Sequence, residues 1–437
     1  MRPELQRSIG LTRATAMVVG IIIGASIFVQ PSAVTAQVHS AKGALLVWVA
    51  AGLLTLIGSL VIAELASAFP RTGGVYVFLS ESYGPALGFL WGWAMFWTMH
   101  SGIVAVIAMV FGRYLGTFID VGSMGEQLFA IASIALFSWV NYRGVRYGSA
   151  VQVALTVIKV LALGLIILIA LAVGSGSLGV AREAAAIIPS PREFVLALFA
   201  GLFAFGGWHM VSYTAEETID PTRTIPRSLL IGTLTVTALY VGVNWAYLRV
   251  LPLDSVATST RVAADFADVA IGGSGREIMA TLVILSTLGA MNGVILAGPR
   301  VYLAMANDGL LFTWAGAVHP VYRTPHRAIV LQGVWSSVLV ATGTYRALFT
   351  RVVYTEWIFF GLLAFALVLL RRRADYTPRY RIWGYPLLPT IFILCTAAIV
   401  INQVMHEPLS SAVGLGLVVA GLPVYYVWAR RQPLSPP

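Results

Sequence analysis

The chain has 437 residues, of which 58% are hydrophobic and 11% are charged, and its mean hydropathy is +0.85. Apolar runs of about 20 residues, the length that crosses a bilayer, recur along the whole chain, which excludes an ordinary soluble protein. The single cysteine, Cys395, excludes an internal disulfide and a thiolate metal cluster, and the six histidines have no ligand spacing. We therefore expect neither a metal nor another cofactor.

Twelve apolar segments are predicted to span the membrane, and the sequence between them is too short for a sizeable soluble domain. The first segment lacks a small-residue cleavage site, so we expect a retained helix and not a signal peptide. The predicted spans are 12–36, 44–68, 85–117, 127–142, 150–173, 194–217, 225–251, 277–305, 328–343, 353–370, 387–405 and 410–429.

The net charge of +10 reflects membrane topology and not nucleic-acid binding. If both termini are cytoplasmic, 18 of the 28 basic residues lie on the cytoplasmic side and nine on the other, with Lys159 inside a span. We therefore predict a multi-pass protein of the cell (inner) membrane with both termini in the cytoplasm. We expect the lipid bilayer to surround the protein.

The first span contains two glycines, Gly20 and Gly24, on either side of an isoleucine run. Glycine is the weakest ordinary helix former, so the pair indicates a break at which backbone groups become free to bind a polar solute. Close packing against another helix is the alternative explanation, because small residues are common at helix contacts in membranes. This stretch alone leaves both open.

A second interruption lies in the sixth span, where Gly206 and Gly207 are adjacent at mid-membrane depth. Breaks at matching positions in the first and sixth spans indicate an inverted repeat of five plus five helices, with the site at the interface of the repeats. We predict one all-α polytopic membrane domain. Its parts are the first repeat (1–175), the inverted second repeat (190–372) and the two appended helices (384–430).

Five stretches resemble motifs of the amino acid-polyamine-organocation superfamily and, within it, the L-type amino acid transporter branch. They are Gly20-Ile-Ile-Ile-Gly-Ala-Ser-Ile-Phe28, Glu64-Leu-Ala-Ser-Ala-Phe-Pro-Arg-Thr-Gly-Gly-Val-Tyr76, Phe203-Ala-Phe-Gly-Gly-Trp208 continuing to Pro226, Leu285-Ser-Thr-Leu-Gly-Ala-Met-Asn-Gly293 with Gly298-Pro-Arg300, and Glu356-Trp-Ile-Phe-Phe360 through Arg373. The resemblance implies a leucine-transporter-type fold of twelve helices that carries a free amino acid.

The resemblance also implies how the substrate is held. An amino acid zwitterion needs partners for both charges, because an unpaired charge is costly in hydrocarbon, and helix breaks supply them. On the carboxylate side we expect Ile23, Gly24, Ala25, Ser26 and Ile27. On the ammonium side and at the gate we expect Phe203, Ala204 and Gly206, with Trp208 as packing or a pocket wall. Ser26 stands where the family pattern has glycine, so it adds a hydroxyl.

Lys159 lies in the middle of the fifth span, where a lysine costs about 2.5–3.5 kcal/mol, so it must face partners inside the bundle. Its surroundings resemble the branch's fifth helix, in which a lysine takes the place of sodium in sodium-coupled relatives. The resemblance implies that its ammonium bridges the first helix and the eighth helix near Ser286 and Thr287. A permanent structural brace and a group that exchanges a proton both remain open.

Other polar residues have a functional and a structural interpretation. By resemblance Tyr240 closes the exit side of the substrate, and Asn244 lies one turn away; an ordinary interhelical hydrogen bond is the alternative. His209 is either a pH-sensitive lining group or a hydrogen-bonded interhelical histidine. Interfacial water is expected to solvate three acids near helix ends, Glu216, Glu217 and Glu356.

These features predict a secondary transporter of neutral L-amino acids that works by alternating access, as an exchanger. No acid and no extra arginine is expected in the pocket, which favours neutral substrates. Proton-coupled symport is the alternative mechanism. An intramembrane enzyme would need a nucleophile with a base or a metal at depth, and a channel would not need paired breaks. We expect no catalysis and no obligatory protein partner.

Overall fold

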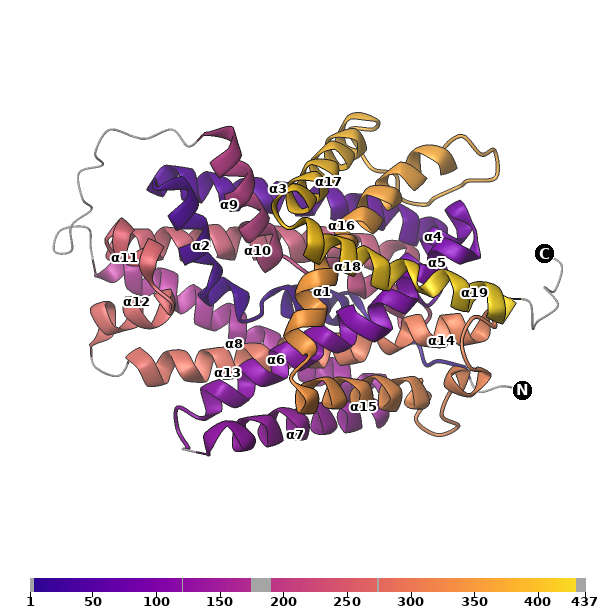
Figure 1. Cartoon of the computed structure of the whole chain (residues 1–437), viewed down its shortest axis with the longest axis horizontal. Helices are drawn as coiled ribbons and strands as arrows, with labels where there is room; N and C mark the ends of the chain where they lie inside the picture. The colour runs from indigo at the N-terminus through magenta and orange to yellow at the C-terminus, as the bar shows by residue number, and fades with distance from the viewer. Residues whose placement is uncertain (1–3, 120, 174–189, 273–274, 430–437) are drawn as a thin grey trace.

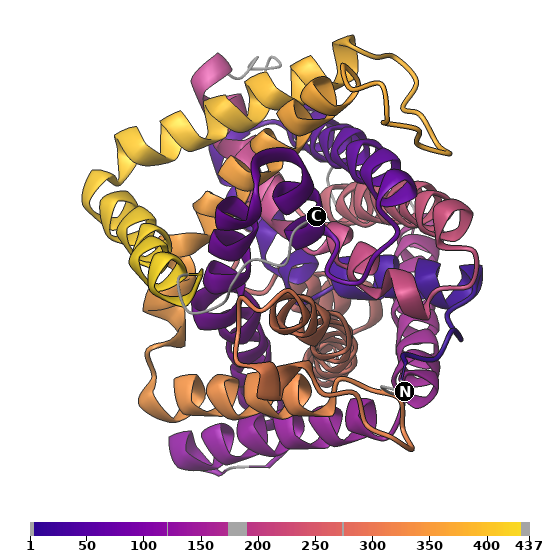
Figure 2. The ribbon, with the colours of Figure 1, turned by 90° about the vertical axis from the view of Figure 1, so that its right-hand side faces the viewer.

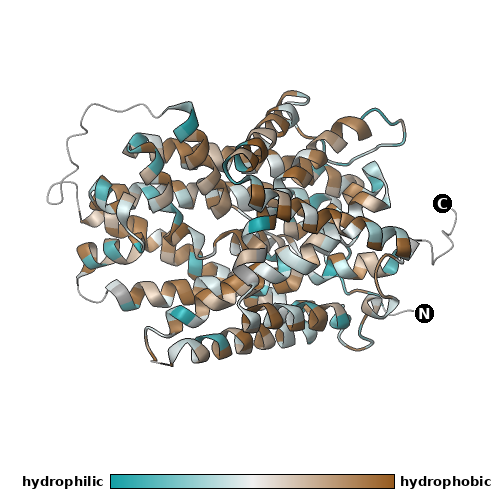
Figure 3. Cartoon of the chain, viewed as in Figure 1, coloured by the Kyte–Doolittle hydropathy of each residue, from teal (hydrophilic) through white to brown (hydrophobic). Residues whose placement is uncertain are grey.

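The computed structural model describes residues 4–119, 121–173, 190–272 and 275–429. Within these ranges the regular elements are helices, apart from one isolated β-bridge between Ile9 and Thr218. Ten of the described helices are long and apolar enough to cross a membrane. Figure 3 shows hydrophobic residues along the helices and hydrophilic ones mainly at their ends and in the loops. The predicted all-α, multi-pass membrane architecture is confirmed.

The helices follow the predicted spans in chain order (Figure 1). The first part contains α1 (Leu11–Ile22), η1 (Ser26–Phe28), α2 (Gln30–Val38), α3 (Ala41–Ala68), α4 (Val75–Tyr83), α5 (Pro85–Ala94), η2 (Met95–Met99), α6 (His100–Leu115), α7 (Gly122–Tyr142) and α8 (Val145–Ala172). The second contains α9 (Pro191–Ala204), η3 (Trp208–Glu217), α10 (Pro221–Val250), α11 (Leu253–Thr258), α12 (Val262–Ile271), α13 (Gly275–Ala297), α14 (Pro299–Asn307), η4 (Thr313–Gly316), α15 (His326–Thr342) and α16 (Tyr345–Leu370). The last are α17 (Leu387–His406), α18 (Pro408–Val419) and α19 (Gly421–Ala429).

Two predicted spans are not among the ten long apolar helices. The first is divided into α1, η1 and α2, and the ninth is α15, which has 17 residues. The third predicted span consists of α5, a π-helical turn (η2) and α6 in succession. The predicted repeat limits at residues 1, 175 and 430 lie outside the described residues.

The bundle has two faces, which we name by the helix ends that lie there. The proximal face carries the ends of α3 and α16 together with α14, and the distal face carries α11 and α12 (Figure 1). Figure 2 looks onto the proximal side and shows α7 and α15 at one edge and α18 and α19 along another. α1 packs on α10, α8 and α13 in the interior, and 8 of its 12 residues are buried.

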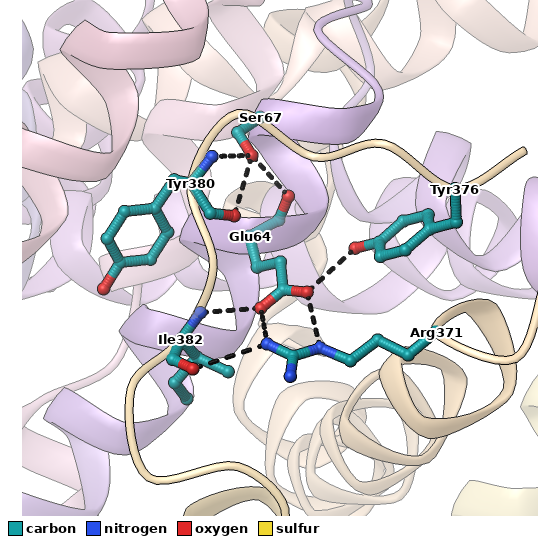
Figure 4. Close-up of polar contacts among 6 residues, drawn as sticks. All are labelled: Glu64, Ser67, Arg371, Tyr376, Tyr380 and Ile382. Atoms are coloured by element: carbon teal, nitrogen blue, oxygen red, sulfur yellow. Dashed lines mark hydrogen bonds and ion pairs between the residues drawn. The ribbon is translucent and has the colours of Figure 1, made fainter.

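The proximal end of α3 is tied to the segment after α16 by the buried carboxylate of Glu64. Arg371 donates to it from Nε at 2.8 Å and from Nη2 at 2.6 Å, and the Ile382 amide donates at 2.7 Å. Burial raises the pKa of Tyr376, so its phenol stays protonated and can donate to the same carboxylate. Such charge-assisted bonds are strong and fix both segments. Figure 4 shows the cluster of Glu64, Ser67, Arg371, Tyr376, Tyr380 and Ile382.

A second buried ion pair, between Glu217 and Arg300, joins the end of η3 to the start of α14. The guanidinium donates to the carboxylate at 2.7 and 2.8 Å, and both side chains are at most 1% exposed. Ser8 and Ile9 donate their amides to the Glu217 carbonyl at 2.9 Å. The expectation that interfacial water solvates Glu217 is therefore wrong, because an arginine neutralises it inside the protein.

Candidate functional site

The first predicted break is present between α1 and η1. The four successive amides of residues 24–27 make no hydrogen bond with any residue that the structure describes. The Ile23 amide still donates to the Val19 carbonyl at 2.9 Å, so Ile23 is not a free donor on the carboxylate side. Ser26 is partly exposed at the start of η1. Unpaired amides at a helix start attract an anionic group.

The two glycines of this stretch have different tasks. A Cβ on Gly20 would overlap Thr156 Oγ1 and Gln152 Nε2, so Gly20 allows α1 to approach α8 closely. A Cβ on Gly24 would meet nothing nearer than 3.9 Å. The packing explanation therefore applies to Gly20, whereas Gly24 belongs to the break itself.

The second predicted break is also present. α9 ends at Ala204, and η3 begins after Gly207, whose φ of +91° is in the left-handed region that favours glycine. A Cβ on Gly207 would overlap the Ile21 side chain, so the two breaks are in contact. The amides of residues 207–209 make no hydrogen bond within the described part of the chain.

Tyr240 of α10 connects the two breaks. Its hydroxyl lies 3.0 Å from the Ile22 carbonyl oxygen and 3.1 Å from the Ala204 carbonyl oxygen, and its side chain is buried. The hydroxyl is a single donor shared between the last turns of two half-helices. Asn244 donates to the Tyr240 carbonyl at 2.8 Å, so its amide group braces α10 and does not reach a break.

The carbonyls predicted for the ammonium side differ in availability. The Ala204 oxygen is already held by Tyr240. The Phe203 oxygen accepts from the Gly206 amide at 3.3 Å and is also approached by the Phe205 amide, whereas the Gly206 oxygen accepts from no described residue. Gly206 is therefore the most available acceptor of the predicted set.

Lys159 of α8 contacts the end of α1 inside the bundle. Its Nζ donates to the Gly20 carbonyl at 2.8 Å and to the Ile23 carbonyl at 2.7 Å, and the residue is 3% exposed. The pocket beside it has a volume of about 10 Å³, which is room for about one water. The ammonium thus replaces the amide donors that a continuous helix would supply.

The eighth helix reaches the same break through one of its two predicted residues. Ser286 Oγ lies 3.3 Å from the Ile23 oxygen and 3.2 Å from the Gly24 oxygen. Thr287 donates to the Ile284 carbonyl of its own helix at 2.8 Å and makes no described bond to the break. Of these two residues, Ser286 joins Lys159 and Tyr240 in holding the end of α1, and Thr287 makes no described bond there.

The aromatic residues at the second break lie on different sides of it. Phe203 is 39% exposed, and its ring meets that of Phe349 edge to face. Trp208 is buried and packs against Phe360 of α16. A pocket of about 350 Å³ near the distal face reaches Phe28, directly after the first break.

A larger pocket of about 440 Å³ lies elsewhere, between α5, η2, α14, α15 and α19. Its lining is aromatic and aliphatic, which suits neither charge of a zwitterion. Among its residues are Trp93, Trp97, Tyr302, Trp335 and Trp428. We do not assign the substrate to it.

One residue at the second break was missed in the sequence. Glu356 was placed near the start of a helix in interfacial water, but α16 begins at Tyr345 and Glu356 is 15% exposed. Its carboxylate lies 3.6 Å from His209 Nε2. This acid lies beside a buried histidine two residues after the second break and lines none of the pockets described above. Arginines at 346 and 351 conceal the start of this helix in the hydropathy profile.

Two touching helix breaks with free amides, free carbonyls and a buried ammonium define a membrane transporter for a small zwitterionic solute. A sequence model of the amino acid permease family matches residues 9–427, and the chain belongs to this family. Because this is a family of transporters, the enzyme alternative is excluded.

Full-length relatives agree with this assignment. The chain is 32% identical over 432 residues to the serine/threonine exchanger SteT of Bacillus subtilis, which covers 98% of each protein. It is 31% identical to the human large neutral amino acids transporter small subunit 2, over 98% of this chain and 81% of that protein. It is 30% identical to the mouse Asc-type amino acid transporter 1, over 99% and 83%.

Proposed function

We propose that this chain exchanges neutral L-amino acids across the cell membrane by alternating access. The observation that carries the proposal is the pair of touching breaks. The free amides of residues 24–27 can bind a carboxylate, and free carbonyl lone pairs can bind an ammonium. Similarity over nearly the whole length to an exchanger supports the same mechanism.

In this proposal the substrate carboxylate binds the amides of Gly24, Ala25, Ser26 and Ile27, and the Ser26 hydroxyl adds a donor. The ammonium binds the carbonyls of Phe203 and Gly206, and Phe203 closes over the substrate. Lys159, Ser286 and Tyr240 hold the half-helix ends in position. The backbone recognises the carboxylate and the ammonium, which all amino acids share. The side chains that line the site therefore select the side chain of the substrate.

The proposed topology places the proximal face in the cytoplasm. The unequal distribution of basic residues supports this orientation. Matching breaks in α1 and α9–η3 support two inverted repeats, over 1–175 and 190–372. The buried pairs Glu64–Arg371 and Glu217–Arg300 then close the cytoplasmic side, while the distal pocket faces outward.

We further propose that the single chain suffices for exchange. The human relative is named a small subunit, which marks that protein as part of an assembly. The exchanger from Bacillus subtilis aligns with this chain from end to end. Exchange by the purified chain alone, without a co-purified protein, tests this point.

Counterflow in proteoliposomes of the purified chain tests the function. Vesicles loaded with one unlabelled amino acid should accumulate a labelled one, with saturation, for serine, threonine, alanine and leucine but not for lysine or glutamate. Uptake into empty vesicles that requires an imposed proton gradient would indicate symport instead, and flux without saturation would indicate a channel. If no amino acid of a broad panel is exchanged, the proposal is wrong.

A further inference from the structure

His209 lies two residues after the second break and has no solvent around it. Its side chain is 0% exposed, and neither ring nitrogen makes a hydrogen bond with a described residue. Aromatic rings surround it, with Trp91, Trp208, Tyr213 and Phe360 between 5.0 and 5.7 Å from its ring centre. Burial of an imidazole without hydrogen bonds costs free energy, so the nearest charged neighbour decides the protonation state of the ring.

That neighbour is Glu356 of α16, whose carboxylate lies 3.6 Å from His209 Nε2. Glu356 precedes Arg371, at the proximal end of the helix, by 15 residues, or about 22 Å along the helix. The other end of α16, at Tyr345, is 11 residues away, or about 16 Å, so this carboxylate lies in the middle part of a membrane-spanning helix. It makes no hydrogen bond with another residue that the structure describes.

The pair can be neutral only with one proton. Either an imidazolium faces a carboxylate, or a neutral imidazole faces a protonated carboxyl group, and both forms hold the same proton between the two residues. Without this proton the pair carries one negative charge, and with two protons it carries one positive charge. Both charged forms are strongly disfavoured in a buried, low-dielectric site. Closure of the protein around the pair therefore selects the form with one proton.

Other polar side chains lie between this pair and the proximal face. Tyr213, one turn further along η3, contacts His209 and also His100 of α6, with ring centres 5.6 and 5.7 Å apart. His100 Nδ1 lies 3.2 Å from the hydroxyl of Tyr302 on α14, and its Nε2 makes no described hydrogen bond. The Tyr213 hydroxyl makes no described hydrogen bond either, so these residues form no continuous hydrogen-bonded chain to the pair.

Titratable groups on the other elements around η3 are engaged elsewhere. On α3, Glu64 pairs with Arg371, and on α10, Tyr240 donates to backbone carbonyls. On α4, Tyr76 donates to an aspartate at 2.8 Å. On α14, Arg300 pairs with Glu217 at the far end of η3. The charge next to His209 is therefore set by Glu356.

We propose that His209 and Glu356 form a proton-binding site, separate from Lys159, that must hold one proton before the transporter can close around its substrate. The proposal rests on the proposed function, because exchange is its readout. Loss of the proton leaves a negative charge beside the second break and stops closure. Exchange therefore falls as the pH rises.

Counterflow with the same pH on both sides of the membrane tests this inference without a driving gradient. In the wild-type protein, exchange should fall between about pH 6 and about pH 9 by up to about tenfold for each pH unit, the limit for one proton. Glu356→Gln, which is uncharged at every pH, should flatten the profile to within about twofold. Glu407→Gln removes an exposed carboxylate between α17 and α18 and should keep the wild-type profile.

Each outcome decides the question. If Glu356→Gln keeps the wild-type pH profile, or if wild-type exchange is independent of pH, the proton site is refuted. If Glu356→Gln does not fold, the double variant His209→Asn with Glu356→Gln, whose two amides can bond to each other, replaces it under the same criterion. Infrared difference spectra of the purified protein at the two pH values should show a change in carboxyl or imidazole bands that is missing in Glu356→Gln, and its presence there contradicts the site. Absence of counterflow at every pH would instead refute the proposed exchange function.

Discussion

The ammonium of Lys159 donates a hydrogen bond to the carbonyl oxygen of Ile23, 2.7 Å away. This carbonyl ends α1, where no following turn supplies an amide donor. The negative end of the half-helix dipole also lies here, so a cation is favoured at this point. Lys159 of α8, together with Ser286 and Tyr240, thus stabilises the break in the first span.

Replacement of Lys159 by alanine should leave two buried carbonyls with fewer donors, at a cost of about 1–3 kcal/mol for each. We expect counterflow to fall at least about tenfold, since about 1.4 kcal/mol corresponds to a factor of ten, and the thermal unfolding temperature in detergent to fall as well. Uptake by Lys159→Ala is then measured against an imposed pH gradient. Unchanged uptake together with an unchanged pH response would show that Lys159 is neither a brace nor a coupling group.

The hydroxyl of Tyr240 can be removed without a change in shape. Tyr240→Phe should reduce exchange and lower stability by about 1–3 kcal/mol, because the Ile22 and Ala204 carbonyls lose their shared donor. Tyr247→Phe is the matched control on the same helix, since Tyr247 is equally buried and its hydroxyl has no described partner. Equal effects of the two substitutions on counterflow and unfolding would contradict the role of Tyr240.

Gly207 should not tolerate any side chain. Its φ of +91° is unfavourable for alanine, and a Cβ would overlap Ile21, so Gly207→Ala should separate the two breaks and abolish exchange. A Cβ on Gly164 of α8 would meet nothing within 4 Å, so Gly164→Ala should transport normally. Both are compared at equal amounts of protein in the vesicles. Normal exchange by Gly207→Ala would show that the breaks need not touch.

The ion pair of Glu64 is expected to be important for stability. Arg371→Gln leaves the buried Glu64 carboxylate without its cation, which should cost about 3 kcal/mol or more in unfolding measurements. Arg71→Gln breaks the exposed pair with Glu81, whose side chains are 52% and 38% exposed, and should cost at most about 1 kcal/mol. A similar cost for both substitutions would mean that burial of the Glu64 pair adds nothing.

The sequence was sufficient for the helices and for both breaks, because apolar length and interior glycines are local signals. Lys159 could also be placed correctly, since an isolated lysine in a span must have partners inside the protein. The family of transporters followed from motifs spread over most of the chain. Each of these predictions depends on residues that are close together in the sequence.

Pairings between distant helices could not be predicted. The contact of His209 with Glu356 joins residues on η3 and α16 that are 147 positions apart, as their residue numbers show. The same holds for Glu217 and Arg300, which were not recognised as partners. From the sequence, a carboxylate near a predicted helix end is expected to contact water. Only the packing of the bundle shows that it is enclosed by other helices.

The β-bridge between Ile9 and Thr218 has a mechanical consequence. It fastens the residues before α1 to those after η3, while at the other ends Gly207, directly before η3, lies against Ile21 of α1. α1 and η3 are thus in contact at both ends. When the proximal side opens, we expect the two helices to move together as one rigid unit. A spectroscopic probe on the segment before α1 would therefore report the motion of η3.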